Sequence, residues 1–323
     1  MLSAEPAILA SALLLDLTLG DPRWLVHPVV IIGRLISALD TLLNRVTSHK
    51  RLAGILLLLL TAGSAGTAAW LLIRVSQQLH PLAGFLASAY ISYTCLAARS
   101  LQRESALVAD ALAAGDLAEA RRTLSYIVGR DTAELDEGEI WRALIETVAE
   151  NTSDGIIAPL FWLTVTGPVG GMVYKAVSTL DSMVGYRSER YLQFGWASAR
   201  MDDLLNFIPA RLTALLMILA APLAGLSPKG ALSITLRDRL KHPSPNSGHP
   251  EAAAAGALGV RLGGPASYKG IPSWKEHIGC PLAPLDGQAY AGMIALMYLT
   301  TLLMAAACIA GAFALGGTLV PQL

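Results

Sequence analysis

The chain has 323 residues, of which 54% are hydrophobic and 15% are charged, and its mean hydropathy is +0.51. These values are typical of membrane proteins with several spans and exclude an ordinary soluble enzyme. Because 24 basic residues balance 24 acidic ones, a nucleic-acid partner held by overall positive charge is excluded as well.

Uncharged stretches predict an all-α, polytopic membrane protein with about five to six membrane helices. Leu52–Ile73 has 22 residues without a charge, or about 33 Å of helix, which crosses a hydrocarbon core of roughly 30 Å. Residues 1–19 lack a basic start and a small-residue cleavage site, so we expect a first membrane helix there and not a removed signal peptide. The other expected spans are 79–98, 155–174, 204–226 and 289–317.

The stretch 155–174 is long enough to span, but its glycines and prolines predict a re-entrant or broken helix. Such backbone is stable at membrane depth only when it is buried in protein or lines a wet cavity. The residues that predict the break are Pro159, Gly167, Pro168, Gly170 and Gly171.

Basic residues indicate the orientation of the chain in the membrane. With six spans, the connections 20–51, 99–154 and 227–288 carry 5, 6 and 7 Lys or Arg, against 1 in 74–78 and 4 in 175–203. The positive-inside rule places the three richer connections in the cytoplasm and the other two, with both termini, outside. We therefore expect a single integral membrane domain, 1–323, with a cytoplasmic helical insertion at 99–154 and a Pro/Gly-rich cytoplasmic loop at 227–288.

The insertion 99–154 is expected to contain three helices. Gly115 ends the first, and Asp116 with Glu119 three residues later resembles an N-cap pair that opens a second helix through Val128. The third helix is expected to start near Asp136.

This third helix carries a stripe of acids that runs into the uncharged stretch after it. Glu139, Glu146, Glu150 and Asp154 fall within an arc of roughly 80°. Like charges four residues apart cost about 0.2 to 0.5 kcal/mol per pair in water, so a compensating cation, Mg²⁺ or an Arg, is expected. The simpler alternative is a solvated face with an Arg142–Glu146 ion pair.

A second group of charges lies at the ends of the later spans. Asp202 and Asp203 enter an apolar stretch, where a buried charge costs about 2.5 to 3.5 kcal/mol. Adjacent aspartates suit Mg²⁺, which is commonly held by one or two carboxylates and phosphate oxygens. A helix N-terminus that favours acids is the alternative, but it leaves Arg211 unexplained. The other basic residues of this group are Lys175 and Arg187.

The connection 227–288 contains eight prolines and many glycines, which favours an ordered irregular loop over regular helix or strand. Within it, Asn246, Ser247 and Gly248 precede a helix-like run at 252–257. Backbone N–H groups in such a turn make an anion site, and His249 adds a donor or a proton acceptor. Any nucleotide must be held in an uncommon way, because the sequence has neither GxxxxGK[ST] nor GxGxxG.

Carboxylates for Mg²⁺ and Arg or Lys for phosphate around a membrane rim favour phosphate chemistry. In the same order along residues 10 to 300, the sequence resembles the adenosylcobinamide-phosphate synthase family of cobalamin biosynthesis. The stretches that carry the resemblance are Leu15–Trp24 with His27–Pro28, Gly129–Thr132, Glu146–Gly155, Asp181–Arg187, Asp202–Arg211 and Ser244–Glu251.

The resemblance implies a multi-pass enzyme of the cell inner (cytoplasmic) membrane that uses ATP and Mg²⁺. It would join adenosylcobyric acid to aminopropanol phosphate or a related aminoalcohol phosphate, forming an amide. Its partners would be these substrates and membrane lipid, with no nucleic acid. A homo-oligomer or a complex with other cobalamin-assembly enzymes is compatible with this function.

Our own hypotheses assign roles to the residues of these stretches. Glu146 and the metal ligands Glu150, Asp154, Asp202 and Asp203 would act through Mg²⁺. His249, or a carboxylate near it, would take the proton of the ammonium so that the amine can attack. The residues expected to hold ATP or the aminoalcohol phosphate are Arg130, Lys175, Arg187, Arg211, Asn246, Ser247 and Gly248.

Two other functions fit parts of the pattern. A membrane prenyltransferase also binds a Mg²⁺-diphosphate with acids near helix ends, but it predicts two similar aspartate-rich repeats, and the acidic clusters here are dissimilar. A sensor-like relative without turnover would have lost several polar clusters, whereas all six stretches are present.

Overall fold

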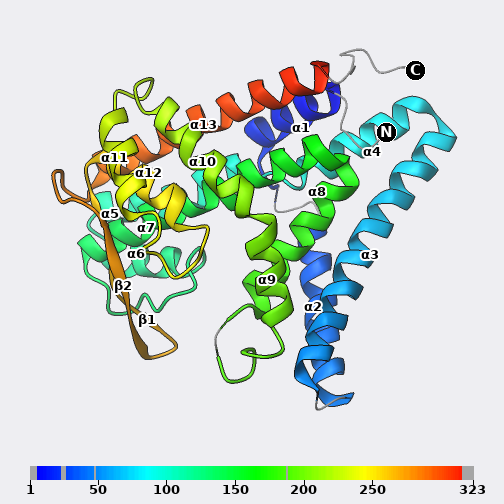
Figure 1. Ribbon diagram of the computed structural model, residues 1–323, viewed down its shortest axis with the longest axis horizontal. Coiled ribbons are helices and arrows are strands. Elements are labelled where there is room, and N and C mark those ends of the chain that lie inside the picture. Colours follow the sequence, from blue (N-terminus) through cyan, green and yellow to red (C-terminus); the bar gives the residue numbers. More distant parts are fainter. Residues whose placement is uncertain (1–5, 23–26, 47–48, 187, 315–323) are drawn as a thin grey trace. The chain divides into compact units, whose positions relative to one another are not determined.

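The computed structural model describes residues 6–22, 27–46, 49–186 and 188–314. Its internal contacts group the elements into two compact units (Figure 1). The first unit contains α1–α4, α8, α9 and the last part of α13, and the second contains α5–α7, η1, α10–α12, β1, β2 and the rest of α13. Because this division reflects only how densely the residues contact each other, the expected single membrane domain stays a prediction.

The first unit is built from apolar helices. The long helix α3 packs against α2, α4, α8 and α9, and α1 packs against α4. Small residues on α3, such as Ala53 and Ala65, are buried in these contacts, which lets the helices approach closely. The bounds are α1 Pro6–Leu19, α2 Pro28–Val46, α3 Lys50–Leu79, α4 Pro81–Tyr93, α8 Ala158–Val184, α9 Trp196–Leu205 and α13 Gly287–Ala314.

The second unit places helices and a β-hairpin around α12. The helix α12 contacts α7, α10, α11 and both strands, so every residue from Gly248 to Ala257 is buried. The bounds are α5 Ala98–Ala113, α6 Leu117–Leu124, α7 Glu137–Thr152, the π-helical turn η1 Ser153–Ile157, α10 Phe207–Ala220, α11 Pro228–Asp238, α12 Gly248–Leu258, β1 Arg261–Tyr268 and β2 Ile271–Gly279.

The helical insertion is confirmed, with helix starts where the sequence predicts them. The Asp116 side chain accepts a hydrogen bond from the Glu119 N–H and opens α6, and Asp136 with Glu139 forms a capping box at the start of α7. The helix α6 ends at Leu124 and not at Val128. Apolar side chains of α5, α6 and α7 form one core, so tertiary packing stabilises these short helices.

Four helical stretches are long and apolar enough to cross a membrane, or five if α9 and α10, bent by 44° at their junction, count as one span. This finding confirms an all-α polytopic membrane protein, to which the hairpin is a small addition. The described part of the first expected span, Pro6–Leu19, has 14 residues, or about 21 Å, which is too short for the hydrocarbon core. Residues 1–5 of that expected span lie outside the described residues.

The expected break near 155–174 is present. The helical stretch 137–184 contains η1, and within α8 Gly167 takes a non-helical φ of 71° directly before Pro168. Proline has no N–H to donate and its ring clashes with the preceding turn, so the helix kinks there.

The expectation of an irregular loop at 227–288 is wrong, because this stretch contains α11, α12 and the antiparallel hairpin β1–β2. Pro228 and Pro250 lie in first turns, where helices tolerate proline. The hairpin turns at Lys269 and Gly270, both with positive φ, which matches the twist of a two-residue turn. Proline content alone therefore misled the prediction.

Candidate active site

The acid stripe of α7 is compensated by an arginine. The Glu146 side chain is 3% exposed and forms an ion pair with Arg130, whose side chain is 9% exposed. The second Glu146 oxygen accepts a hydrogen bond from the Gly263 N–H at 2.7 Å. Burial lowers the pKa of Arg130 and the Glu146 charge raises it, with a net upward shift. The predicted cation is thus Arg130, from the loop that precedes α7.

The alternative Arg142–Glu146 pair is wrong. The Arg142 guanidinium donates instead to the carbonyl oxygens of Gly263 and Pro265 and lies 4.0 Å from the Glu139 carboxylate. The first residues of β1 therefore contact both Glu146 and Arg142, and this face of α7 is not solvated.

The turn before α12 contacts the next acid of the stripe. Ser247 Oγ donates to Glu150 Oε1 at 2.8 Å, and the Ser244 hydroxyl accepts from the N–H groups of Asn246 and Ser247 at 3.2 and 3.3 Å. This turn places Ser247 over α7. The structure thereby brings the acid stripe of α7 and the predicted anion-binding turn at Asn246–Gly248 together within the second unit.

The remaining predicted residues of this turn have structural partners. Asn246 Oδ1 lies 3.4 Å from Arg211 Nη1. A Cβ at Gly248 would lie 2.4 Å from the Arg239 carbonyl oxygen, so close packing requires glycine there. His249 is buried, its Nε2 has no hydrogen-bond partner among the described residues, and burial followed by the charges of Arg211 and Arg239 lowers its pKa to about 4.

Three residues that the sequence analysis assigned no role join this cluster. Lys275 of β2 lies 3.1 Å from His242 Nε2, and His242 Nε2 lies 3.6 Å from Glu251 Oε1 of α12. The Ser244 N–H donates to His242 Nδ1 at 3.0 Å, which leaves the proton of a neutral imidazole on Nε2. Lys275, His242 and Glu251 therefore form a row of neighbouring titratable groups.

Burial and neighbouring charges shift the pKa values of these three groups. Burial lowers the pKa of Lys275, but Glu251, Glu146 and Glu150 raise it to a net upward shift. Burial and then Lys275 lower the pKa of His242 to about 4. The pKa of the Glu251 carboxyl is raised well above its ordinary value, first by burial and then by Glu146 and Glu150 against the opposing charge of Lys275.

Glu251 is the least satisfied member of the cluster. Its side chain is 1% exposed, and neither carboxyl oxygen has a hydrogen-bond partner among the described residues. A buried carboxyl in this state favours its neutral form. Such perturbed groups gather at functional sites more often than elsewhere.

The other predicted residues do not belong to this cluster. Lys175, Asp202 and Asp203 lie in the first unit. There Asp202 accepts a hydrogen bond from Asn206 at 2.9 Å, and Asp203 lies 3.6 Å from Arg200. Asp154 lies in η1 after α7, and Arg187 lies outside the described residues.

The magnesium site stays a prediction. In the described ranges, no group of three or more His, Cys, Asp or Glu side chains is arranged to hold a metal ion. Because Arg130 and Gly263 engage Glu146, that residue fits a positioning role. Glu150 and Asp154, four residues apart and both partly buried, offer oxygen donors of the kind Mg²⁺ prefers when phosphate completes its shell.

Little in the sequence identified the missed residues. Lys275 is buried only because β2 pairs with β1 and places residues 271–279 against α11 and α12. The one usable signal is a count of charges. The acids of α7 and Glu251 carry more negative charge than Arg130 alone can balance, which indicates a further basic residue nearby.

Comparison with known proteins identifies the family. The family described as CobD/Cbib protein matches residues 9–312. The cobalamin biosynthesis protein CobD of Pelobacter propionicus is 68% identical over 323 residues, covering 100% of both chains. That of Geobacter metallireducens is 62% identical over 292 residues, covering 90% of this chain and 92% of the relative.

Relatives with lower sequence identity carry names from the same family. The cobalamin biosynthesis protein CbiB of Salmonella typhi is 44% identical over 309 residues, covering 95% of this chain and 97% of the relative. No solved structure matches. On the family match and these identities, the chain belongs to the CobD/CbiB family of cobalamin biosynthesis proteins.

Proposed function

We propose that the protein catalyses ATP-dependent amide ligation of adenosylcobyric acid with aminopropanol phosphate or a related aminoalcohol phosphate, giving adenosylcobinamide phosphate. The observation that carries the proposal is the buried charge cluster of the second unit. Arg130–Glu146, Ser247–Glu150 and Lys275–His242–Glu251 come from four separate stretches of the chain and meet around α12. A family role in cobalamin biosynthesis supports it.

The chemistry of ligation accounts for this kind of cluster. A carboxylate and an amine do not condense in water, so the propionate must be activated, most simply as an acyl phosphate with release of ADP. Mg²⁺ bound with ATP would neutralise charge on the phosphoryl oxygens. Glu150 and Asp154 are the proposed ligands in this unit.

The basic residues of the unit provide electrostatic stabilisation. Arg130 is held in place by Glu146 and partly exposed, so it can face a transferring phosphoryl group without losing its own counter-ion. Arg211, near Asn246, is a further proposed phosphate contact. Such preorganised charges cost no reorganisation when negative charge develops.

When the amine attacks the acyl phosphate, the C–O bond to phosphate breaks, inorganic phosphate leaves and the amine loses a proton. A general base works best with a pKa near the operating pH, and a pKa of about 4 makes His249 a weak base. Glu251, the carboxylate near it, has a raised pKa and free lone pairs. We therefore assign proton acceptance to Glu251 and a neutral hydrogen-bonding role to His249.

The site is proposed to face the cytoplasm at the inner membrane, because ATP and the corrinoid are cytoplasmic. The basic connections 99–154 and 227–288 support this orientation.

A direct assay tests the function. The purified protein is incubated with adenosylcobyric acid, aminopropanol phosphate, ATP and Mg²⁺, and the corrinoid is weighed by mass spectrometry. We expect a corrinoid heavier by the condensed amine, with one ADP formed per product and none when ATP is omitted. An unchanged corrinoid mass with folded, inserted protein rejects the proposal.

A further inference from the structure

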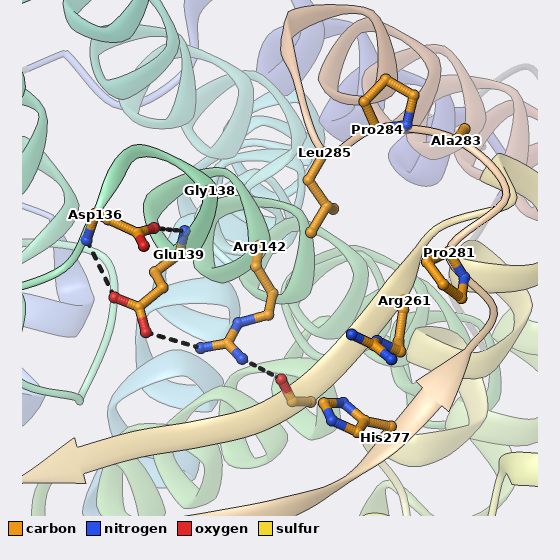
Figure 2. Close-up of a pocket in the computed structure, with 11 residues that line it drawn as sticks. Asp136, Gly138, Glu139, Arg142, Arg261, His277, Pro281, Ala283, Pro284 and Leu285 are labelled. Carbon is orange, nitrogen blue, oxygen red and sulfur yellow. Dashed lines mark hydrogen bonds and ion pairs between the residues drawn. The ribbon is translucent and has the colours of Figure 1, made fainter.

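A pocket of about 380 Å³ lies in the second unit and is lined in part by the first residues of β1. Figure 2 shows the Arg142 side chain extending toward the Glu139 carboxylate, with Arg261 and His277 on the strands and Pro284 and Leu285 on another wall. Its size is at the lower end for small-molecule sites. The lining residues come from the start of α7, from both strands and from the segment before α13.

Arg142 supplies the pocket with an unused hydrogen-bond donor. Arg142 is 8% exposed, and its Nη groups donate to the carbonyl oxygens of Gly263 and Pro265. Its Nε has no hydrogen-bond partner among the described residues. A buried guanidinium with an unused N–H favours an acceptor at that position.

The pocket combines basic and acidic side chains. The Glu139 carboxylate, 4.0 Å from Arg142, compensates one positive charge while it also closes the capping box with Asp136. Arg261 adds a second guanidinium, and His277, whose Nδ1 lies 3.4 Å from the Leu262 carbonyl oxygen, adds an imidazole ring. Asp136 adds a second carboxylate, so the pocket suits a ligand that carries both an anionic and a cationic group.

Glycine at position 264 permits this arrangement. Gly264 has a φ of 89°, and a Cβ there would lie 2.7 Å from Arg142 Nη1 and 2.8 Å from His277 Cε1. Any side chain would separate the arginine from the histidine. The backbone of β1 is therefore shaped so that both groups line one pocket.

The geometry points to a phosphomonoester site, and we propose that this pocket binds the phosphate group of the aminoalcohol phosphate through Arg142 Nε, Arg261 and His277. The choice of that ligand rests on the proposed function. A corrin ring is far too large for the pocket, and the acids Asp136 and Glu139 at its edge suit a ligand that carries an ammonium group better than they suit the triphosphate of ATP.

The pocket is connected to the charge cluster through a single residue. Gly263 donates its N–H to Glu146 at 2.7 Å and accepts from Arg142 with its carbonyl oxygen. A ligand that draws on the Arg142 guanidinium would therefore act on the peptide that positions Glu146.

Binding is tested on the full chain in detergent without ATP or corrinoid. Isothermal titration calorimetry with aminopropanol phosphate compares the native protein with Arg261→Gln and His277→Gln. Lys229→Gln, which removes an exposed charge in the same unit, is the matched control. We expect Arg261→Gln to weaken binding by about 10- to 100-fold, the loss of one charge-assisted hydrogen bond, and the control to bind as the native protein does.

Parallel titrations distinguish the sources of phosphate. Competition by inorganic phosphate at higher concentration, with unchanged binding of a non-hydrolysable ATP analogue in Arg261→Gln, supports the pocket. Equal affinity of Arg261→Gln and Lys229→Gln for aminopropanol phosphate overturns it, even if the protein ligates normally. Binding that depends on Arg261 in a protein that forms no amide would keep the pocket and reject the proposed function.

Discussion

The helices α3 and α12 have opposite relations between polarity and burial. In α3 the most apolar window is only 28% buried, and leucines such as Leu59 and Leu79 are exposed, as expected for a helix that contacts lipid. In α12 the polar His249 and Glu251 are buried among neighbouring helices. In this protein the exposed apolar side chains suit contact with lipid. The charged side chains lie inside, where each needs a partner.

The largest expected effect concerns the cation that compensates the interior acids. Replacing Lys275 by Met leaves Glu146, Glu150 and Glu251 with less positive charge, and removal of one partner from a buried charge group costs up to about 3 to 5 kcal/mol. We expect Lys275→Met to lower the melting temperature in detergent clearly, whereas Lys229→Met on exposed α11 should not. Equal melting temperatures of the two variants would show that Lys275 does not stabilise the cluster.

A second effect distinguishes the two titratable groups of α12. A base acts when deprotonated, so turnover falls as the pH drops through its pKa. Because the pKa of Glu251 is raised and that of His249 is about 4, we expect the acidic limb of the native pH–rate profile well above pH 4. It should vanish together with most activity in Glu251→Gln and persist in His249→Gln.

The same profile can reverse this assignment. If the acidic limb lies near pH 4 and His249→Gln removes it, then the imidazole is the base and Glu251 has a structural role.

A smaller effect concerns the residue that positions Glu150. Ser247→Ala removes the 2.8 Å hydrogen bond to Glu150 Oε1, and loss of such a supporting contact typically costs about 10- to 100-fold in metal affinity or activity. We expect a roughly tenfold rise in the Mg²⁺ concentration for half-maximal turnover, with the melting temperature near the native value. Ser233→Ala on exposed α11 is the control. An unchanged Mg²⁺ dependence would separate Glu150 from the metal.

The smallest effect is at the hairpin tip. Asp131 accepts hydrogen bonds from the Ser267 hydroxyl and from the Lys269 and Gly270 N–H groups, which lower its pKa below 3.8. A lowered pKa contributes stability above the ordinary value, and this contribution is lost as the pH falls through the folded value. Asp131→Asn should therefore lower the melting temperature slightly at pH 7, and this difference should shrink toward pH 3.

Local signals were predictable from the sequence, and long-range pairings were not. The capping pairs at Asp116 and Asp136 and the need for a cation beside Glu146 follow from neighbours on one helix. The Gly167–Pro168 break was likewise expected from local chemistry. The burial of Lys275 depends on the pairing of β1 with β2, which no local pattern encodes, so the hairpin and a central charge of the site were both missed.

The measurement closest to the central claim is ligation by matched carboxylate variants of folded, inserted protein. Glu150→Gln, in the second unit, is compared with Glu189→Gln, an exposed acid of the first unit. We predict a loss of about 100-fold or more in Glu150→Gln and native turnover in Glu189→Gln. Near-native corrinoid ligation by Glu150→Gln would contradict it, because the buried charge cluster would then not be where the reaction occurs.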